Sequence, residues 1–285
     1  MSSKVYEIIT EQVMDLLGQG TVPWHKPWIG GYPKNLISKK EYRGINVFLL
    51  SVKGYASPYW VSYKQAQELG GNVKKGEKST MVVFWKQIKV QDEGSPDSSG
   101  EITEKTIPLL RYYRIFNLEQ CENIDMGKVP QTDINLNFQP ITACEETVMS
   151  MQNKPDICHE EPRAYYNPSQ DYVNMPRKEN FTKEEFYYSV IFHELGHSTG
   201  HEKRLARKQL SEWATFGSEK YSKEELVAEM TAAFLCGHHG IEQETLENSA
   251  AYIKSWLKKL QDDPKMVVLA AAQGQKAADY ILGAD

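Results

Sequence analysis

The sequence predicts an α+β protein in which a mixed N-terminal part, with helices and an antiparallel sheet, precedes a mainly helical part with a small sheet. Three observations support this fold class. Helical hydrophobic spacing and β-rich runs both occur in the first half, and helical spacing dominates the second half. The polar residues 121–137 between the halves lack periodicity. We therefore expect domains at 1–125 and 138–285, joined by a linker at 126–137.

Helical spacing in the first half begins at residues 4–17, where apolar side chains recur on one side of an amphipathic helix. The apolar run 47–50 predicts the start of a second helix. Residues 62–70 read as a short third helix, which ends at Gly70.

Two hairpins are expected, one in each half. The β-rich runs 80–85 and 107–116 flank a polar loop at 91–106, whose Gly, Ser, Pro and acidic residues are typical of a solvated excursion. In the second half, the runs 163–167 and 171–176 flank a short turn.

The second half is otherwise predicted to be helical. Thr182 and Glu185 have the spacing of a capping box, which indicates the start of a helix that ends near Gly200. Further helices are expected at about 140–152, from 222 onward, at about 246–260 and at 266–281.

The motif HExxH lies on the helix before Gly200. His193 and His197 are one helical turn apart, so both imidazoles can bind one metal ion, and Glu194 beside them can act as a general base. This arrangement is typical of a zinc hydrolase of the zincin type, with manganese or cobalt as alternative metals. The competing interpretation is a surface helix that carries two histidines by coincidence.

A catalytic zinc ion takes three protein ligands, so a third must come from elsewhere. His201 is read as a surface residue or a neighbour of the ligands. The run from Glu225 to Glu229 resembles the glutamate-ligand helix of gluzincin peptidases, which implies that Glu225 binds the metal and that Glu229 supports a ligand histidine. An alternative remains, because Ser222 and Glu225 also have capping-box spacing; in that case Glu229 would be the ligand.

The composition indicates the cellular location of the protein and the kind of partner it binds. The chain has 285 residues, 40% of them hydrophobic, and no apolar run of membrane-spanning length or signal-peptide core, so we expect a cytoplasmic protein without a membrane partner. Its four cysteines lack metal-binding spacing and indicate reduced thiols. The net charge of −5 conceals a segment at 20–90 with a charge of +9, which indicates a polyanionic partner.

Cations interleaved with aromatic residues in this segment predict binding to single-stranded DNA, because cations neutralise phosphates while aromatic faces stack on unpaired bases. The alternatives are that the tryptophans pin loops to a core and that each lysine is simply solvated. The candidate nucleic-acid-binding residues are Trp24, Lys26, Trp28, Lys39, Lys40, Arg43, Asn46, Trp60, Lys64, Lys74, Lys75, Lys78 and Trp85.

Nearly the whole chain resembles the ArdC-type antirestriction proteins of conjugative plasmids and related mobile elements. The resemblance is carried by residues 24–28, 42–46, 64–66, 70–78 and 116–120 in the first half and by 193–197 and 224–229 in the second. It implies a single-stranded-DNA-binding domain followed by a zincin-like metallopeptidase domain. The implied function is protection of DNA that enters a recipient cell during conjugation.

Two functions follow as hypotheses. The first is an antirestriction protein that acts by covering single-stranded DNA and carries a metal-binding second domain. The second is a zinc metallopeptidase tethered to DNA, whose protein substrate would be a restriction enzyme subunit, a repressor or a protein crosslinked to DNA. A purely structural metal is the third interpretation, against which an intact Glu194 and an open ligand position argue.

Overall fold

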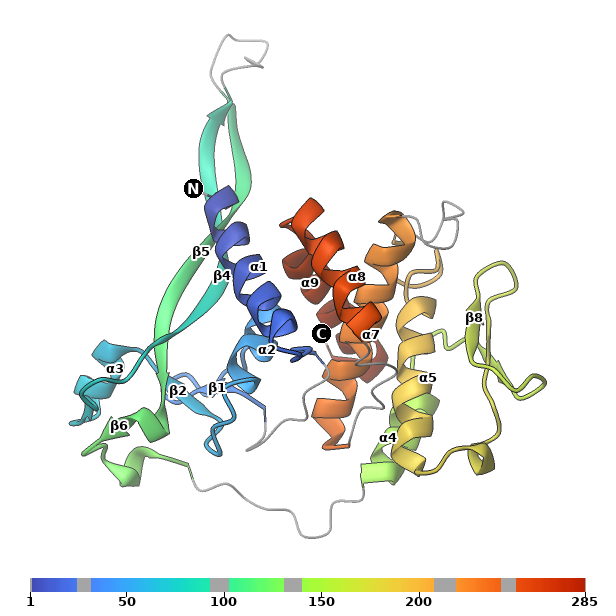
Figure 1. The fold of residues 1–285 in the computed structure, drawn as a ribbon, viewed down its shortest axis with the longest axis horizontal. Coiled ribbons are helices and arrows are strands. Elements are labelled where there is room, and N and C mark those ends of the chain that lie inside the picture. Colours follow the sequence, from blue (N-terminus) through green and yellow to red (C-terminus); the bar gives the residue numbers. More distant parts are fainter. Residues whose placement is uncertain are drawn as a thin grey trace.

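The structure, a computed structural model, describes residues 2–24, 32–92, 103–130, 140–207, 219–241 and 250–284. Helices and short sheets occur together in this part of the chain, and helices dominate its second half (Figure 1). The expected α+β fold class is therefore confirmed.

The first half contains a four-stranded sheet, two strands of which form a long hairpin, and a separate two-stranded sheet. Its elements are α1 (Ser2–Gly18), β1 (Lys34–Asn35), α2 (Ile45–Ser51), β2 (Tyr59–Val61), α3 (Tyr63–Glu68), β3 (Asn72–Val73), β4 (Thr80–Asp92), β5 (Thr103–Asn117) and β6 (Cys121–Glu122). The four-stranded sheet has the strand order β1-β2-β5-β4 and is antiparallel except for the parallel pair β1–β2, and the two-stranded sheet is made by β3 and β6. The three helices expected from the hydrophobic spacing are all present.

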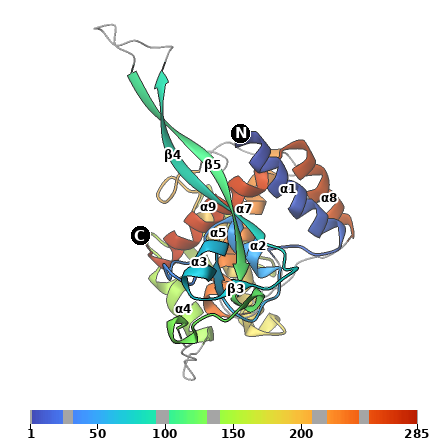
Figure 2. The same ribbon diagram turned by 90° about the vertical axis from the view of Figure 1, so that its left-hand side faces the viewer.

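The β4–β5 hairpin extends away from the body of the molecule (Figures 1 and 2). Its register runs from the pair Thr80–Ile115 to the pair Asp92–Thr103. The expected loop at 91–106 is therefore too long at both ends, because backbone pairing continues through Gln91 and Asp92 on one side and residues 103–106 on the other. Residues 93–102 lie outside the described part of the chain.

The second half is mainly helical. Its elements are α4 (Pro140–Ser150), β7 (Asp156–Cys158), β8 (Tyr165–Asn167), β9 (Tyr172–Asn174), α5 (Glu184–Ser198), α7 (Glu219–His239), α8 (Ala250–Asp262) and α9 (Met266–Leu282). β8 and β9 form the expected hairpin, and β7 pairs with β9 in parallel. β7 was not among the strands predicted from the sequence.

Both predicted capping boxes in the second half are wrong. Lys183 is the N-cap of α5 and makes no side-chain capping bond, so Thr182 lies outside the helix start. α7 begins at Glu219, which places Ser222 inside the helix. Glu225 is therefore not a capping residue, and the interpretation that assigned it only that role is excluded.

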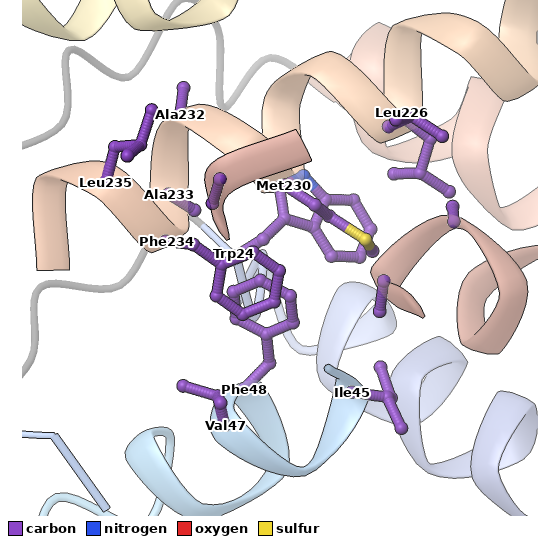
Figure 3. Packing of buried hydrophobic residues seen from close by; sticks show 14 of the residues in the cluster. Trp24, Ile45, Val47, Phe48, Leu226, Met230, Ala232, Ala233, Phe234 and Leu235 are labelled. Carbon is purple, nitrogen blue, oxygen red and sulfur yellow. The ribbon is translucent and has the colours of Figure 1, made fainter. Parts of the chain in front are cut away.

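The largest hydrophobic core includes residues from both halves of the chain. Phe48 of α2 stacks on Phe234 of α7, with ring centroids 4.7 Å apart, and Trp24 is buried in the same cluster (Figure 3). Outside the apolar contacts, Thr10 of α1 donates a hydrogen bond of 2.6 Å to the Pro264 carbonyl oxygen. The two halves therefore pack as one body. The linker expected at 126–137 remains a prediction, and its residues 131–137 lie outside the described ranges.

All four cysteines carry free thiols, which agrees with the expectation of reduced cysteines. In the described ranges, no helix has both the length and the apolar character needed to cross a bilayer.

Candidate metal centre and nucleic-acid interface

Helices α5 and α7 bring the candidate metal ligands together. They approach closely at Gly196, where an added Cβ would lie 3.1 Å from the Thr231 Cβ and 3.2 Å from the Ala228 Cα. Glycine at this position of the motif therefore permits the short distance between the helices. As a result, the histidines on α5 face the carboxylates on α7.

His193, His197 and Glu225 form a group whose potential ligand atoms all lie within 4.8 Å of one another. The two Nε2 atoms are 3.1 Å apart, and the Glu225 oxygens lie 3.6 Å from His193 Nε2 and 3.5 Å from His197 Nε2. Ligand atoms at about 2.0–2.1 Å from a tetrahedral zinc ion are roughly 3.4 Å apart. The observed triangle therefore fits a divalent metal ion with one coordination position left open.

A carboxylate that the sequence did not single out lies beside the other ring nitrogen of His197. Glu224 Oε1 lies 3.7 Å from His197 Nδ1, which permits electrostatic attraction but is too long for a hydrogen bond. Glu224 is itself buried and paired with Arg207, whose Nε donates to Glu224 Oε2 over 3.1 Å. A carboxylate beside the second nitrogen of a ligand histidine orients the ring.

Arg207 also ties the end of α5 to α7. Its Nη2 donates to the Gly196 carbonyl oxygen over 2.8 Å, and its Nη1 donates to Thr199 Oγ1 over 2.6 Å. The guanidinium thus satisfies a carbonyl in the last turn of α5 while it pairs with Glu224. No sequence signal indicated Arg207, because its partners depend on how the loop after α5 folds back.

The electrostatics of the centre favour a cation. Burial would lower the pKa of His197, but the neighbouring Glu224, Glu225 and Glu194 outweigh burial and raise the pKa to about 9. The three carboxylates therefore stabilise positive charge at this point, whether it is carried by a proton or by a metal ion. Protons and metal compete for the same imidazole.

Glu194 and Glu229 differ in their surroundings. Glu194 is buried, with 8% of its surface exposed, and its charge acts on His197. Glu229 accepts a hydrogen bond of 2.7 Å from the Trp24 indole Nε1. Among the described residues, the group that could hold a metal contains Glu225 and not Glu229. Trp24, from the first half of the chain, thus supports the helix that carries the third candidate ligand.

His201 lies apart from this group. Its Nδ1 is 3.8 Å from Asp171 Oδ2, and Asp171 also pairs with the buried Arg204. His201 is therefore part of the polar contact between the β8–β9 turn and the segment after α5.

Three of the candidate DNA-binding residues are buried, and the prediction that they contact bases is wrong for them. Trp24 and Trp60 are 1% and 2% exposed, so neither has a free face for stacking. Asn46 is also buried and exchanges two hydrogen bonds of 2.7 Å with the backbone of Val83. For Trp24, the alternative in which tryptophan pins its loop to the core is the correct one.

The remaining candidates are exposed or lie outside the described ranges. Lys26 and Trp28 fall outside them. Arg43 forms an ion pair with Asp279 of α9, and Trp85 is 45% exposed beside Tyr6. The exposed lysines are Lys39, Lys40, Lys64, Lys74, Lys75 and Lys78.

The hairpin carries further exposed aromatic residues that were not among the candidates. Phe84, Tyr112 and Tyr113 are 43%, 48% and 53% exposed. Their neighbours Arg111 and Arg114 are exposed as well. A run of Arg, Tyr, Tyr and Arg places one aromatic and one cation on each face of a strand, and this alternation was the signal that could have identified them.

Comparisons with known proteins identify a matching family model for each half of the chain. Residues 3–116 match the family model of the N-terminal domain of anti-restriction factor ArdC, and residues 144–273 match that of zincin-like metallopeptidases. The metal-free crystal structure of the antirestriction ArdC protein from the R388 plasmid is similar, with a TM-score of 0.74 and 38% identity, covering 97% of this chain and 96% of that one. The Mn(II)-bound structure of the R388 protein gives the same TM-score at 35% identity, with 98% and 97% covered.

Curated relatives include larger proteins. A DNA primase TraC of Escherichia coli is 36% identical over an alignment of 294 residues, which covers 97% of this chain and 27% of the primase. The chain thus spans about a quarter of that relative and 20% of a second TraC primase. The y4eC protein of Sinorhizobium fredii is 32% identical, with 97% of this chain and 91% of the relative covered.

Proposed function

Because the chain belongs to the ArdC family of antirestriction proteins, we propose that it binds single-stranded DNA and protects the DNA of a mobile element as it enters a recipient cell by conjugation. Its zincin-like domain binds zinc, with manganese or cobalt as alternatives, through His193, His197 and Glu225. The observation that carries the DNA-binding proposal is the row of exposed aromatic residues and arginines on the β4–β5 hairpin.

Each face of the hairpin presents both exposed aromatic residues and an arginine. Directly paired residues of an antiparallel ladder point to the same face, so the pairs Phe84–Arg111 and Val82–Tyr113 share one face, which we call the Phe84 face. The Phe84 and Tyr113 rings meet edge to face, with centroids 5.5 Å apart. An unpaired base can stack on such exposed rings, whereas the base faces of a duplex are hidden.

The opposite face, which we call the Trp85 face, contains the pairs Trp85–Leu110 and Val83–Tyr112. Val83 and Leu110 are buried in the main core, while Trp85 and Tyr112 remain exposed. Their diagonal positions in the ladder place them at a spacing of about 7 Å, which suits consecutive bases of an extended strand.

The test is the affinity of two double variants, Phe84→Ala with Tyr113→Ala and Trp85→Ala with Tyr112→Ala, for an unstructured oligonucleotide. Each base that stacks on an aromatic ring contributes about 1–3 kcal/mol, so losing two rings is expected to weaken binding by tenfold or more. Met149→Ala, which alters an exposed apolar residue on α4, is the control. Equal affinity of the unaltered protein for single-stranded and duplex DNA would contradict the proposal.

A DNA-tethered metallopeptidase is the second candidate function, favoured by the ligand triangle and by Glu194 beside it. A bound divalent ion would supply Lewis-acid polarisation of a peptide carbonyl and would acidify water. Glu194 would accept the proton from the attacking water, and Glu224 with Arg207 would hold the His197 ring in its orientation. The substrate class would be a restriction enzyme subunit, a repressor or a protein crosslinked to DNA.

One variant separates the two functions. Glu194→Gln is expected to retain metal and DNA binding and to lose any peptidase activity, because glutamine cannot accept the proton. Conjugative transfer into a restricting recipient then measures protection. Protection that persists at the level of the unaltered protein would show that peptidase activity is not its cause.

A further inference from the structure

A cavity of about 210 Å³ lies at the base of the hairpin, on the Trp85 face. It is formed where α1 passes the first residues of β4 and the last residues of β5. The side chains that matter for its chemistry are Gln12, Lys53, Ser79, Tyr112 and Arg114.

The lining of this cavity favours an anion. Lys53 and Arg114 contribute two positive charges, and none of the lining residues is acidic. Arg114 Nη1 donates to Ser79 Oγ over 3.3 Å, which fixes one side of the guanidinium and leaves its other donors available. In the described part of the chain, neither cation has a carboxylate within ion-pair distance.

We propose that this cavity binds one phosphate group of a DNA strand. The planar fork of an arginine matches two phosphate oxygens, a lysine adds a point charge, and serine and glutamine donate neutral hydrogen bonds. The inference rests on the proposed binding of single-stranded DNA and names a subsite within it.

The size of the cavity limits what enters. Sites for drug-sized ligands measure about 300–1,000 Å³, so a volume of about 210 Å³ suits a phosphate with part of its sugar rather than a whole nucleotide. The base would remain outside. Tyr112, which lines the cavity and is 48% exposed, offers it a stacking surface, and Trp85 lies diagonally beyond Tyr112 in the ladder.

The proposal is tested with Lys53→Gln, Arg114→Gln and the double variant, by measuring oligonucleotide affinity as a function of salt. For single strands the slope of log affinity against log salt changes by about 0.7 per phosphate contact, so the double variant is expected to flatten the slope by up to that amount. Because the remaining cation still faces the same phosphate, each single variant should flatten the slope less than the double variant does. The expected loss of affinity at moderate salt is about tenfold.

Two controls isolate the subsite. Lys258→Gln removes an equal charge from an exposed position on α8 and should leave the slope unchanged. Arg114→Lys keeps the charge and should retain the slope while it loses part of the affinity. Circular dichroism and thermal melting confirm that each variant is folded.

Oligonucleotides with and without a 5′-phosphate identify the source of the phosphate group. If the variants lose affinity equally for both oligonucleotides, the cavity binds an internal phosphodiester. If they lose affinity only for the phosphorylated oligonucleotide, the cavity binds the terminal phosphate. If the unaltered protein binds single strands but all three variants keep its affinity and slope, the subsite is wrong and DNA binding stands. If the unaltered protein binds no DNA, the proposed function itself fails.

Discussion

Replacing Trp24 with phenylalanine removes one hydrogen-bond donor from the contact between the N-terminal segment and the helix that carries Glu225. The Trp24 indole is 1% exposed and donates to Glu229 over 2.7 Å. A hydrogen bond to a charged group contributes about 1.5–3 kcal/mol, and the smaller ring leaves a gap in a packed core at a further cost of about 1 kcal/mol. We therefore expect Trp24→Phe to lower the free energy of unfolding by about 3 kcal/mol.

The assay is a double-mutant cycle with Glu229→Ala, in which the free energy of unfolding of each variant is measured by urea unfolding. A chelator is present so that metal binding does not contribute. The coupling energy between the two positions is expected to be about 1.5–3 kcal/mol, and thermal melting of Trp24→Phe should occur roughly 6–12 °C lower. Trp85→Phe is the matched control, because that ring is 45% exposed and should change stability by less than about 0.5 kcal/mol. A coupling energy below about 0.5 kcal/mol would refute the assigned hydrogen bond.

The other predictions concern the helix contact, a buried ion pair and the metal. Gly196→Ala places a Cβ about 3.1 Å from the Thr231 Cβ, so we expect α5 and α7 to move apart. The free energy of unfolding should fall by about 1–3 kcal/mol, and the metal affinity measured by calorimetric titration should weaken. Unchanged stability together with unchanged metal affinity would contradict this prediction. Burial would raise the pKa of Asp171, but hydrogen bonds from Arg204 and Tyr166 outweigh it and lower the pKa to about 2. Because this folded-state pKa is below the unfolded one, the ionised carboxylate stabilises the folded protein by about 2 kcal/mol above pH 4, and this contribution is lost as the pH falls towards 2. We therefore expect Asp171→Asn to lower the free energy of unfolding at pH 7 and to leave it nearly unchanged at pH 2, as measured by chemical unfolding. Zinc at a hundredfold excess over its dissociation constant should raise stability by about 2.7 kcal/mol, and the absence of that rise in the unaltered protein, or its persistence in His193→Ala, would rule out the proposed ligands.

The part of the candidate metal centre that depends on helical periodicity was predictable from the sequence. His193 and His197 share a face of α5 because they are four residues apart, and Glu225 was implied by the resemblance of residues 225–229 to the glutamate-ligand helix of gluzincin peptidases. Glu224 and Arg207 were not predictable, because their contact depends on how residues 199–207 after α5 pack against α7. A single sequence carries no signal for such a tertiary contact.

The aromatic residues show a second limit of sequence reasoning. Trp24 and Trp85 are the same residue type in the same basic half, yet one is buried against α7 and the other lies on a projecting hairpin. Burial of a large ring and stacking on a base use the same apolar surface, so composition cannot separate them. The hairpin was predicted, but its length was underestimated because backbone pairing extends both strands beyond the β-rich runs into mostly polar residues.

The stacking of Phe48 on Phe234 has an evolutionary consequence. Recombination that exchanged only one half would leave apolar surface exposed on both products, and such surfaces lead to aggregation. The two halves should therefore be inherited as a single block. The TraC primase match has this form, since 97% of the present chain corresponds to one continuous quarter of a much longer polypeptide. Attempts to transplant the first half into another protein are best made with α7 and its surroundings included.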